Sequence, residues 1–61
     1  MKELDVVKLI KEFGDLPKGT IGTIVLEYDG KFFEVEFMNE KGETLGVLTT
    51  PADCLELVKM K

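Results

Sequence analysis

Apolar residues recur along the chain in short runs that are separated by turn-forming residues. The runs occupy residues 5–10 (DVVKLI), 21–28 (IGTIVLEY), 32–38 (FFEVEFM), 44–49 (TLGVLT) and 55–58 (LELV). Most are rich in β-branched or aromatic residues and alternate between apolar and polar positions, which is typical of strands. In the first run, Leu4, Val7 and Ile10 could form a helical stripe, but its paired valines and short length favour a strand. The pattern therefore predicts five strands.

The dipeptide Asp29-Gly30 lies between two of these runs and predicts a tight hairpin. Both central positions of a type I′ turn require a positive φ, which Asp and Gly tolerate. A two-residue loop would pair Leu26 with Phe33 and Ile24 with Val35. Alternation then predicts one buried face, made of Ile24, Leu26, Phe33, Val35 and Phe37.

The segment Asn39-Glu40-Lys41-Gly42 predicts a second hairpin, with a type I turn that ends in a left-handed glycine. A three-residue loop with a bulge would pair Phe37 with Leu45 and Val35 with Val47, all apolar. Further on, Thr50-Pro51-Ala52-Asp53 predicts one turn of 3-10 helix, with Thr50 as the N-cap and Pro51 at the first position. One helical turn should therefore precede the last strand.

Five strands in this order, with one 3-10 turn before the last, resemble the Src-homology-3-like (SH3-like) barrel. Because 61 residues leave no room for a second core, we expect a single all-β domain over residues 1–61. A glycine before the alternating strand 21–28 also resembles the KOW-type element of ribosomal and transcription-elongation proteins. Residues 4–7, 19–25, 28, 33–37 and 51–56 carry a further resemblance. Through them the chain is similar to a bacterial domain-of-unknown-function family, numbered four-nine-two-six, which implies a small bacterial barrel and brings no established activity.

The charged residues narrow the range of functions. Twelve acidic residues face eight lysines, for a net charge of −4, and the chain has no arginine and no histidine. Since nucleic acids are held mainly through their phosphates, we expect no nucleic-acid partner. One cysteine, Cys54, allows neither an intramolecular disulfide nor a zinc site. The start MKELDVV lacks the apolar core of a signal peptide and no run is long enough to span a bilayer, so we expect a cytoplasmic protein without a membrane partner.

No candidate motif predicts catalysis. Gly19-Thr20-Ile21-Gly22 has the spacing of the loop with which KH domains hold RNA. We interpret it instead as a turn with Pro17 at the second position and Gly19 at its close, followed by a bend at Gly22. Glu27, Glu34 and Glu36 could form a carboxylate pair or a metal patch, and a solvated outer face explains them better. Cys54 is flanked by acids and should pack as a small apolar residue. We therefore expect no enzyme, no cofactor and no metal.

Two groups of residues are candidates for binding a partner. In the predicted registers Val25, Glu34 and Leu48 lie side by side on the outer face, and Phe32 lies in a neighbouring row. If the apolar residues of this group are exposed, they mark a protein interface; the alternative is that the first loop or a terminus covers them. Ligands of this barrel class often bind between the long first loop, the hairpin and the turn before the last strand. The resemblance therefore implies that Phe13, Tyr28, Pro51 and Asp53 lie together.

These observations predict a non-enzymatic module that binds a protein partner, such as an accessory subunit or an antitoxin- or immunity-like protein encoded beside its partner. The alternative is an RNA-binding KOW-like barrel, which would need a lysine cluster made of Lys11, Lys18, Lys31 and Lys41. Homo-oligomerisation stays open, because edge strands of a short barrel can pair across chains.

Overall fold

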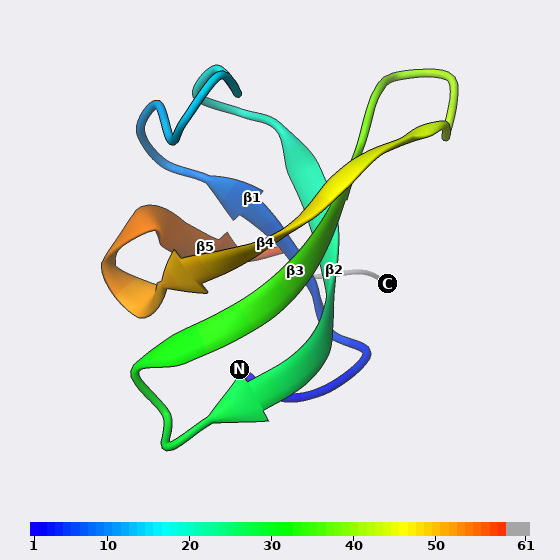
Figure 1. The fold of residues 1–61 in the computed structure, drawn as a ribbon. Helices are drawn as coiled ribbons and strands as arrows, with labels where there is room; N and C mark the ends of the chain where they lie inside the picture. The colour runs from blue at the N-terminus through cyan, green and yellow to red at the C-terminus, as the bar shows by residue number, and fades with distance from the viewer. Residues whose placement is uncertain (59–61) are drawn as a thin grey trace.

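The computed structural model describes residues 1–58 and is all-β, as predicted (Figure 1). Its strands are β1 (Val6–Leu9), β2 (Ile21–Tyr28), β3 (Phe32–Met38), β4 (Thr44–Pro51) and β5 (Leu55–Leu57), with the 3-10 turn η1 (Ala52–Cys54) before β5. They form one antiparallel sheet in the order β4-β3-β2-β1-β5. The first apolar run is a strand and not a helix, and the predicted single turn stands before the last strand.

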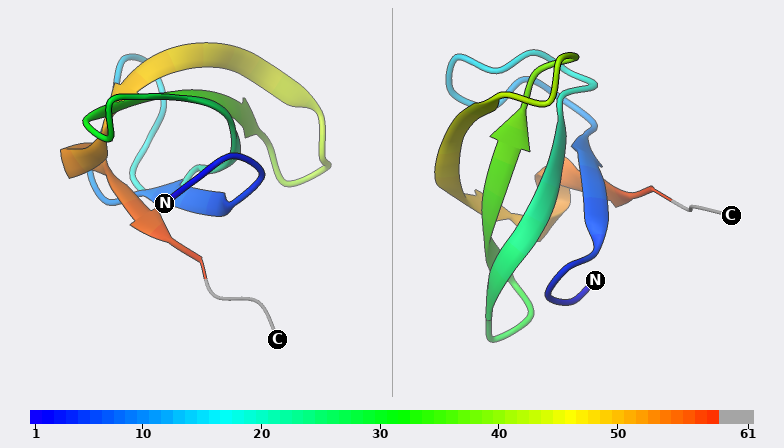
Figure 2. Two further views of the ribbon diagram at one scale, coloured as in Figure 1. Left: turned by 90° about the horizontal axis from the view of Figure 1, so that it is seen from below. Right: turned by 90° about the vertical axis from the view of Figure 1, so that its right-hand side faces the viewer.

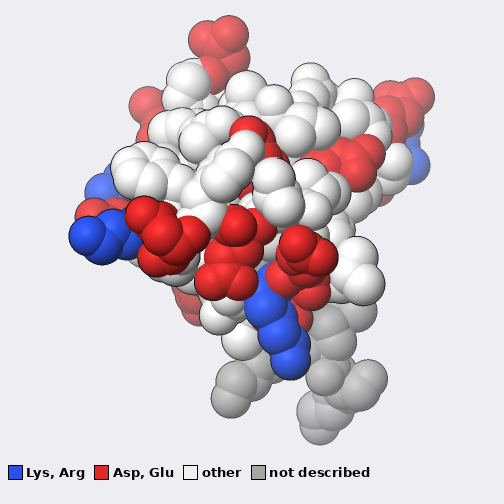
Figure 3. All heavy atoms as spheres, turned by 60° about the horizontal axis from the view of Figure 1, so that its bottom comes forward, with Lys and Arg blue, Asp and Glu red and all other residues white. Residues whose placement is uncertain are grey.

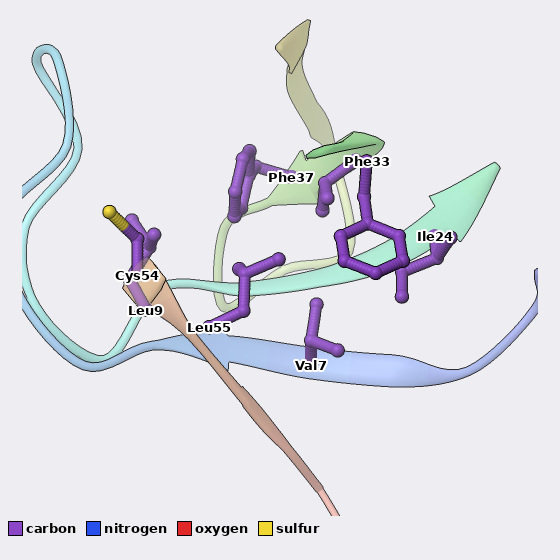
Figure 4. Packing of buried hydrophobic residues seen from close by; sticks show 8 residues of the cluster. Val7, Leu9, Ile24, Phe33, Phe37, Cys54 and Leu55 are labelled. Carbon is purple, nitrogen blue, oxygen red and sulfur yellow. The ribbon is translucent and has the colours of Figure 1, made fainter. Parts of the chain in front are cut away.

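The sheet curls around one small core (Figure 2). Inward-facing side chains of β1, β2 and β3 meet η1 and the start of β5 there, as Figure 4 shows. The long loop between β1 and β2 adds Phe13 and Leu16 at the edge of this core. The fully or almost fully buried apolar residues are Val7, Leu9, Ile24, Phe33, Val35, Phe37, Cys54 and Leu55. The prediction that Cys54 packs as an apolar residue is confirmed.

The first hairpin has the predicted turn but not the predicted register. Asp29 and Gly30 both have positive φ, at 38° and 78°, and the Lys31 N–H donates to the Tyr28 carbonyl at 3.2 Å. The ladder begins at Tyr28–Phe32, one residue later on β3 than predicted, so that Leu26 lies opposite Glu34. A β-bulge at Val25 then restores the predicted pair Ile24–Val35. The prediction that Leu26 is buried is therefore wrong, because the bulge reverses the alternation.

The second hairpin also has the predicted turn but not the predicted register. Gly42 has the predicted left-handed conformation, with φ at 83°, and the Asn39 side-chain oxygen accepts from the N–H groups of Lys41 and Glu43 at 2.8 and 3.0 Å. The predicted register is wrong, since Phe37 lies opposite Gly46 and Val35 opposite Leu48. A bulge at Leu45 shifts the pairing by one residue.

The end of β4 also differs from the prediction. The strand continues through Pro51, and Pro51, without a side-chain hydrogen bond, occupies the N-cap position of η1. Thr50 is fully buried, and its hydroxyl donates to the Leu48 carbonyl at 3.1 Å. The prediction of Thr50 as the N-cap is wrong because its hydroxyl is used inside the sheet.

Candidate functional site

The outer surface of β2, β3 and β4 carries apolar side chains close to the first hairpin. Phe33, Val35 and Phe37 of β3 are buried, so the alternate residues Phe32 and Glu34 face outward. Cross-strand pairing forms one row from Tyr28 through Phe32 to Pro51, and a second row from Leu26 through Glu34 to Thr49. We call Leu26, Tyr28, Phe32 and Pro51 the outer-face patch; the first three are 41%, 42% and 45% exposed.

Glu34 lies within this patch and is held in place by its neighbours. One carboxylate oxygen, Oε2, accepts from the Tyr28 hydroxyl at 2.8 Å and from the Thr49 hydroxyl at 2.9 Å. Within residues 1–58 no hydrogen bond reaches the other oxygen, Oε1. The hydrogen bond to Glu34, with desolvation and the negative charge of Glu34, raises the pKa of Tyr28 above its ordinary value. The patch thus holds a fixed carboxylate with one oxygen available to a donor.

A shallow hollow of about 460 Å³ borders the patch and is lined by Gly30, Lys31, Phe32, Pro51, Ala52 and Asp53. Its two sides are joined by the Ala52 N–H, which donates to the Lys31 carbonyl at 2.9 Å. Of the residues predicted to lie together, Pro51 and Asp53 line this hollow. Tyr28 is the cross-strand neighbour of Phe32, a residue of the predicted outer row that also lines it.

Phe13 does not join this group. It lies in the long loop between β1 and β2, at the opposite end of the sheet from the first hairpin (Figures 1 and 2). Its side chain packs against the core, and its backbone pairs with Leu16. The expectation that Phe13 lies near Tyr28, Pro51 and Asp53 is therefore wrong.

The predicted outer row is also rearranged. Val25, Phe32 and Leu48 are all exposed, so within residues 1–58 neither the first loop nor the N-terminus covers them. Val25 and Leu48 do not flank Glu34, because Val25 lies in the bulge and Leu48 lies opposite the buried Val35, whereas Phe32 lies in the neighbouring row as predicted. Leu26 and Thr49 take their places beside Glu34. The sequence did not mark these two residues: the predicted register put Leu26 in the core, and Thr49 was assigned to no site.

In the motif Gly19-Thr20-Ile21-Gly22, which has the spacing of an RNA-holding loop, the backbone donors bond within the protein. The Gly19 N–H donates to the Leu9 carbonyl at 2.8 Å, and the Thr20 N–H and hydroxyl donate to the Pro17 carbonyl at 3.2 and 2.7 Å. The turn therefore starts at Pro17 and closes at Thr20, one residue later than predicted. Gly22 packs directly against Val35 and Phe37. Because these donors are used, the motif is structural.

A second shallow hollow, of about 350 Å³, lies between this turn and the second hairpin. Its lining residues are Pro17, Lys18, Gly19, Thr20, Ile21, Met38, Asn39, Glu40 and Leu45. No group of three or more Cys, Asp or Glu side chains lies close enough to hold a metal ion anywhere in residues 1–58. Nor does that part of the chain contain a helix with the length and apolar character needed to cross a membrane.

Comparison with known proteins yields one result. A family model described as a domain of unknown function (DUF4926) matches residues 3–57. The chain belongs to the DUF4926 family. No curated protein and no solved structure matches it.

Charge adds to the description of this DUF4926 chain. Figure 3 shows a face on which acidic side chains outnumber lysines and border an uncharged area. With a net charge of −4, the DUF4926 chain should attract basic groups over distances of about a Debye length, roughly 8 Å at physiological salt.

Proposed function

We propose that the protein is a non-enzymatic interaction module that binds a protein partner through the outer-face patch. The observation that carries the proposal is the cluster of exposed Leu26, Tyr28 and Phe32 around the fixed carboxylate of Glu34. Aromatic side chains such as Tyr and Phe are enriched at protein interfaces, where they bury a large area with little loss of conformational freedom. An accessory subunit and an antitoxin- or immunity-like protein would both use such a surface.

Glu34 suggests the chemistry of the partner. Its Oε2 is oriented by Tyr28 and Thr49, and its Oε1 has no hydrogen bond from residues 1–58. A lysine or arginine of the partner could bond to Oε1 while apolar side chains cover Phe32 and Leu26. Such a charge pair would be oriented before binding, which lowers the entropy lost on association.

An affinity experiment with matched variants tests this proposal. The tagged wild-type protein, a Phe32→Glu variant and an Ile21→Glu variant are each used to capture proteins from native cell lysate, with quantification by mass spectrometry. Ile21 is a suitable control because it is 39% exposed and lies at the other end of β2. We expect a protein that is enriched by the wild type and by Ile21→Glu and is lost with Phe32→Glu. Equal capture by all three proteins, or no enrichment at all, contradicts the proposal.

The RNA-binding alternative requires the four candidate lysines to gather. Lys11 and Lys18 lie in the long loop and Lys41 in the second hairpin, whereas Lys31 lies in the first hairpin at the opposite end of the sheet (Figures 1 and 2). A fluorescence titration with single-stranded RNA at low salt separates the two proposals. Binding that weakens steeply as salt is added would favour RNA as the ligand.

A further inference from the structure

The strand β4 forms an open edge of the sheet. It pairs with β3 on one side, and on its other side no segment of residues 1–58 pairs with it. In the right-hand view of Figure 2, β4 forms one side of the molecule. The opposite edge, β5, is only three residues long and has Glu56 at its centre. The long edge is therefore β4, with eight residues.

The hydrogen bonds at the two ends of β4 show which backbone groups face this open edge. The Ala52 N–H donates to the Lys31 carbonyl, and the Asn39 N–H donates to the Glu43 carbonyl, both at 2.9 Å. Residues of an antiparallel strand alternately bond to the neighbouring strand and point away from it. Counted from Ala52, Leu48 and its alternate neighbours therefore bond to β3, and counting from Glu43 agrees because the bulge at Leu45 shifts the alternation by one residue. The N–H and carbonyl groups of Val47 and Thr49 point to the open edge.

This edge lacks the usual protection against pairing. Natural edge strands carry charges, especially lysine, or are very short. The residues from Thr44 to Ala52 form the longest uncharged run in a chain that is 33% charged. A bulge at Leu45 and the missing N–H of Pro51 protect the two ends of β4, but the centre from Gly46 to Thr50 is unprotected.

We propose that β4 pairs antiparallel with β4 of a second copy of this chain, about a two-fold axis that passes through Leu48. In this register Val47 of each copy lies opposite Thr49 of the other, so the groups that face the open edge bond to each other. Both are β-branched and lie on the outer face, where such pairs pack well. The two five-stranded sheets become one continuous sheet. The contact is isologous, as in most homodimers.

Leu48 supports a second copy as the occupant of this edge. It shares a face with the buried Val35, yet it is 36% exposed, because the sheet ends at β4 and nothing in residues 1–58 lies beyond it. On the two-fold axis Leu48 lies against Leu48 of the second copy, and both side chains become buried. The residues that meet carry no charge, so the net charge of −4 on each chain does not bring carboxylates together at the centre.

Acidic residues at the two ends of the shared ladder make the affinity of the dimer depend on salt. Glu43 precedes β4 and Asp53 follows it, and in this register Glu43 of one copy approaches Asp53 of the other. Both residues are exposed, so salt screens their repulsion. The dimer should therefore tighten as salt is raised and in a Glu43→Gln variant. The dimer uses the edge of the sheet and the outer-face patch uses its face, and the two surfaces meet on β4, where Pro51 belongs to the patch and the Thr49 hydroxyl donates to Glu34.

Sedimentation equilibrium of the full chain tests the association. We expect the weight-average mass to rise from 6.9 kDa towards twice that value as the protein concentration is raised from micromolar to millimolar. A Leu48→Lys variant should stay monomeric over this range, and an Ile21→Lys variant, which makes the same charge change on a strand paired on both sides, should associate like the wild type. Circular dichroism checks that each variant is folded. A wild type that stays at 6.9 kDa throughout overturns the proposal.

Disulfide trapping tests the register and does not depend on the Leu48→Lys variant folding. Leu48→Cys and Val47→Cys are each made in a Cys54→Ala background and oxidised. Directly opposed residues at a non-hydrogen-bonded position have Cα atoms about 4.5 Å apart, within disulfide range. The two Val47 residues are offset by two positions, about 7 Å along the strands, which puts their Cα atoms roughly 8 Å apart and beyond that range. We expect covalent dimer from Leu48→Cys and little from Val47→Cys; the reverse result, or no dimer from either, overturns the proposal.

Discussion

Replacing Gly22 with alanine should destabilise the fold by placing a methyl group in the packed core. An added Cβ would lie 2.6 Å from Cγ1 of Val35, 2.9 Å from Cδ1 of Phe37 and 3.0 Å from the Glu36 carbonyl oxygen. Carbon atoms in contact are normally about 3.5–4.0 Å apart. Val35 and Phe37 are completely buried, so neither side chain can turn outward to make room.

The size of the effect follows from these contacts. Overpacking a well-filled core costs typically about 1–3 kcal/mol. The lower flexibility of alanine in the unfolded chain offsets about 0.4–1 kcal/mol of this. A 61-residue domain at about 0.05–0.15 kcal/mol per residue has a free energy of unfolding of about 3–9 kcal/mol. A net loss of about 1–2 kcal/mol should therefore lower Tm by about 5–15 °C.

Thermal and urea unfolding followed by circular dichroism measure this loss. The matched control is a double-mutant cycle with Val35→Ala, which removes the methyl group nearest to the new Cβ. The loss in free energy of unfolding of the double variant should be smaller than the sum of the two single losses by about 0.5–3 kcal/mol. If Gly22→Ala unfolds at the wild-type temperature, or if the two losses simply add, the packing argument for Gly22 is wrong.

Three further predictions concern other parts of the fold. The pKa of Tyr28 should lie above its ordinary value of 10.0 and fall towards that value in a Glu34→Gln variant. The fold favours the neutral phenol, so the contribution of Tyr28 to stability is complete below pH 10 and is lost as the pH rises through the raised pKa. Ultraviolet absorbance reads this titration directly, since Tyr28 is the only tyrosine. Asn39→Ala should lower the free energy of unfolding by about 1–2 kcal/mol in urea, because the N–H groups of the second hairpin lose their acceptor. Phe37→Ala should cost about 3–5 kcal/mol and leave much of the chain unfolded by circular dichroism.

The local sequence was enough to predict the strands and their turns. Residues 21–28 and 32–38 coincide with β2 and β3, and the left-handed glycines Gly30 and Gly42 lie in the predicted hairpins. Turn geometry depends on the φ that individual residues tolerate, and strand propensity depends on the side chains within one short run. Both are local properties, so a sequence pattern reports them well.

The candidate site could be predicted only in part. Tyr28 and Pro51 lie near each other as predicted, because each is close along the chain to the first hairpin or to η1, and Phe32 of the other predicted group lies between them in the same row. Leu26 was assigned to the core and Thr49 to no site, and both flank Glu34. Phe13 was assigned to the site and packs on the core instead.

The sequence by itself thus determined that this chain is a small acidic all-β domain with five strands, two glycine-containing hairpins and one turn before the last strand. Tertiary structure decided the register, through the bulges at Val25 and Leu45. A bulge adds one residue to one strand, and its position depends on how the curled sheet fills its core. Because one residue of shift moves a side chain to the other face, the bulges placed Leu26 beside Glu34 and Leu48 on the same face as the buried Val35.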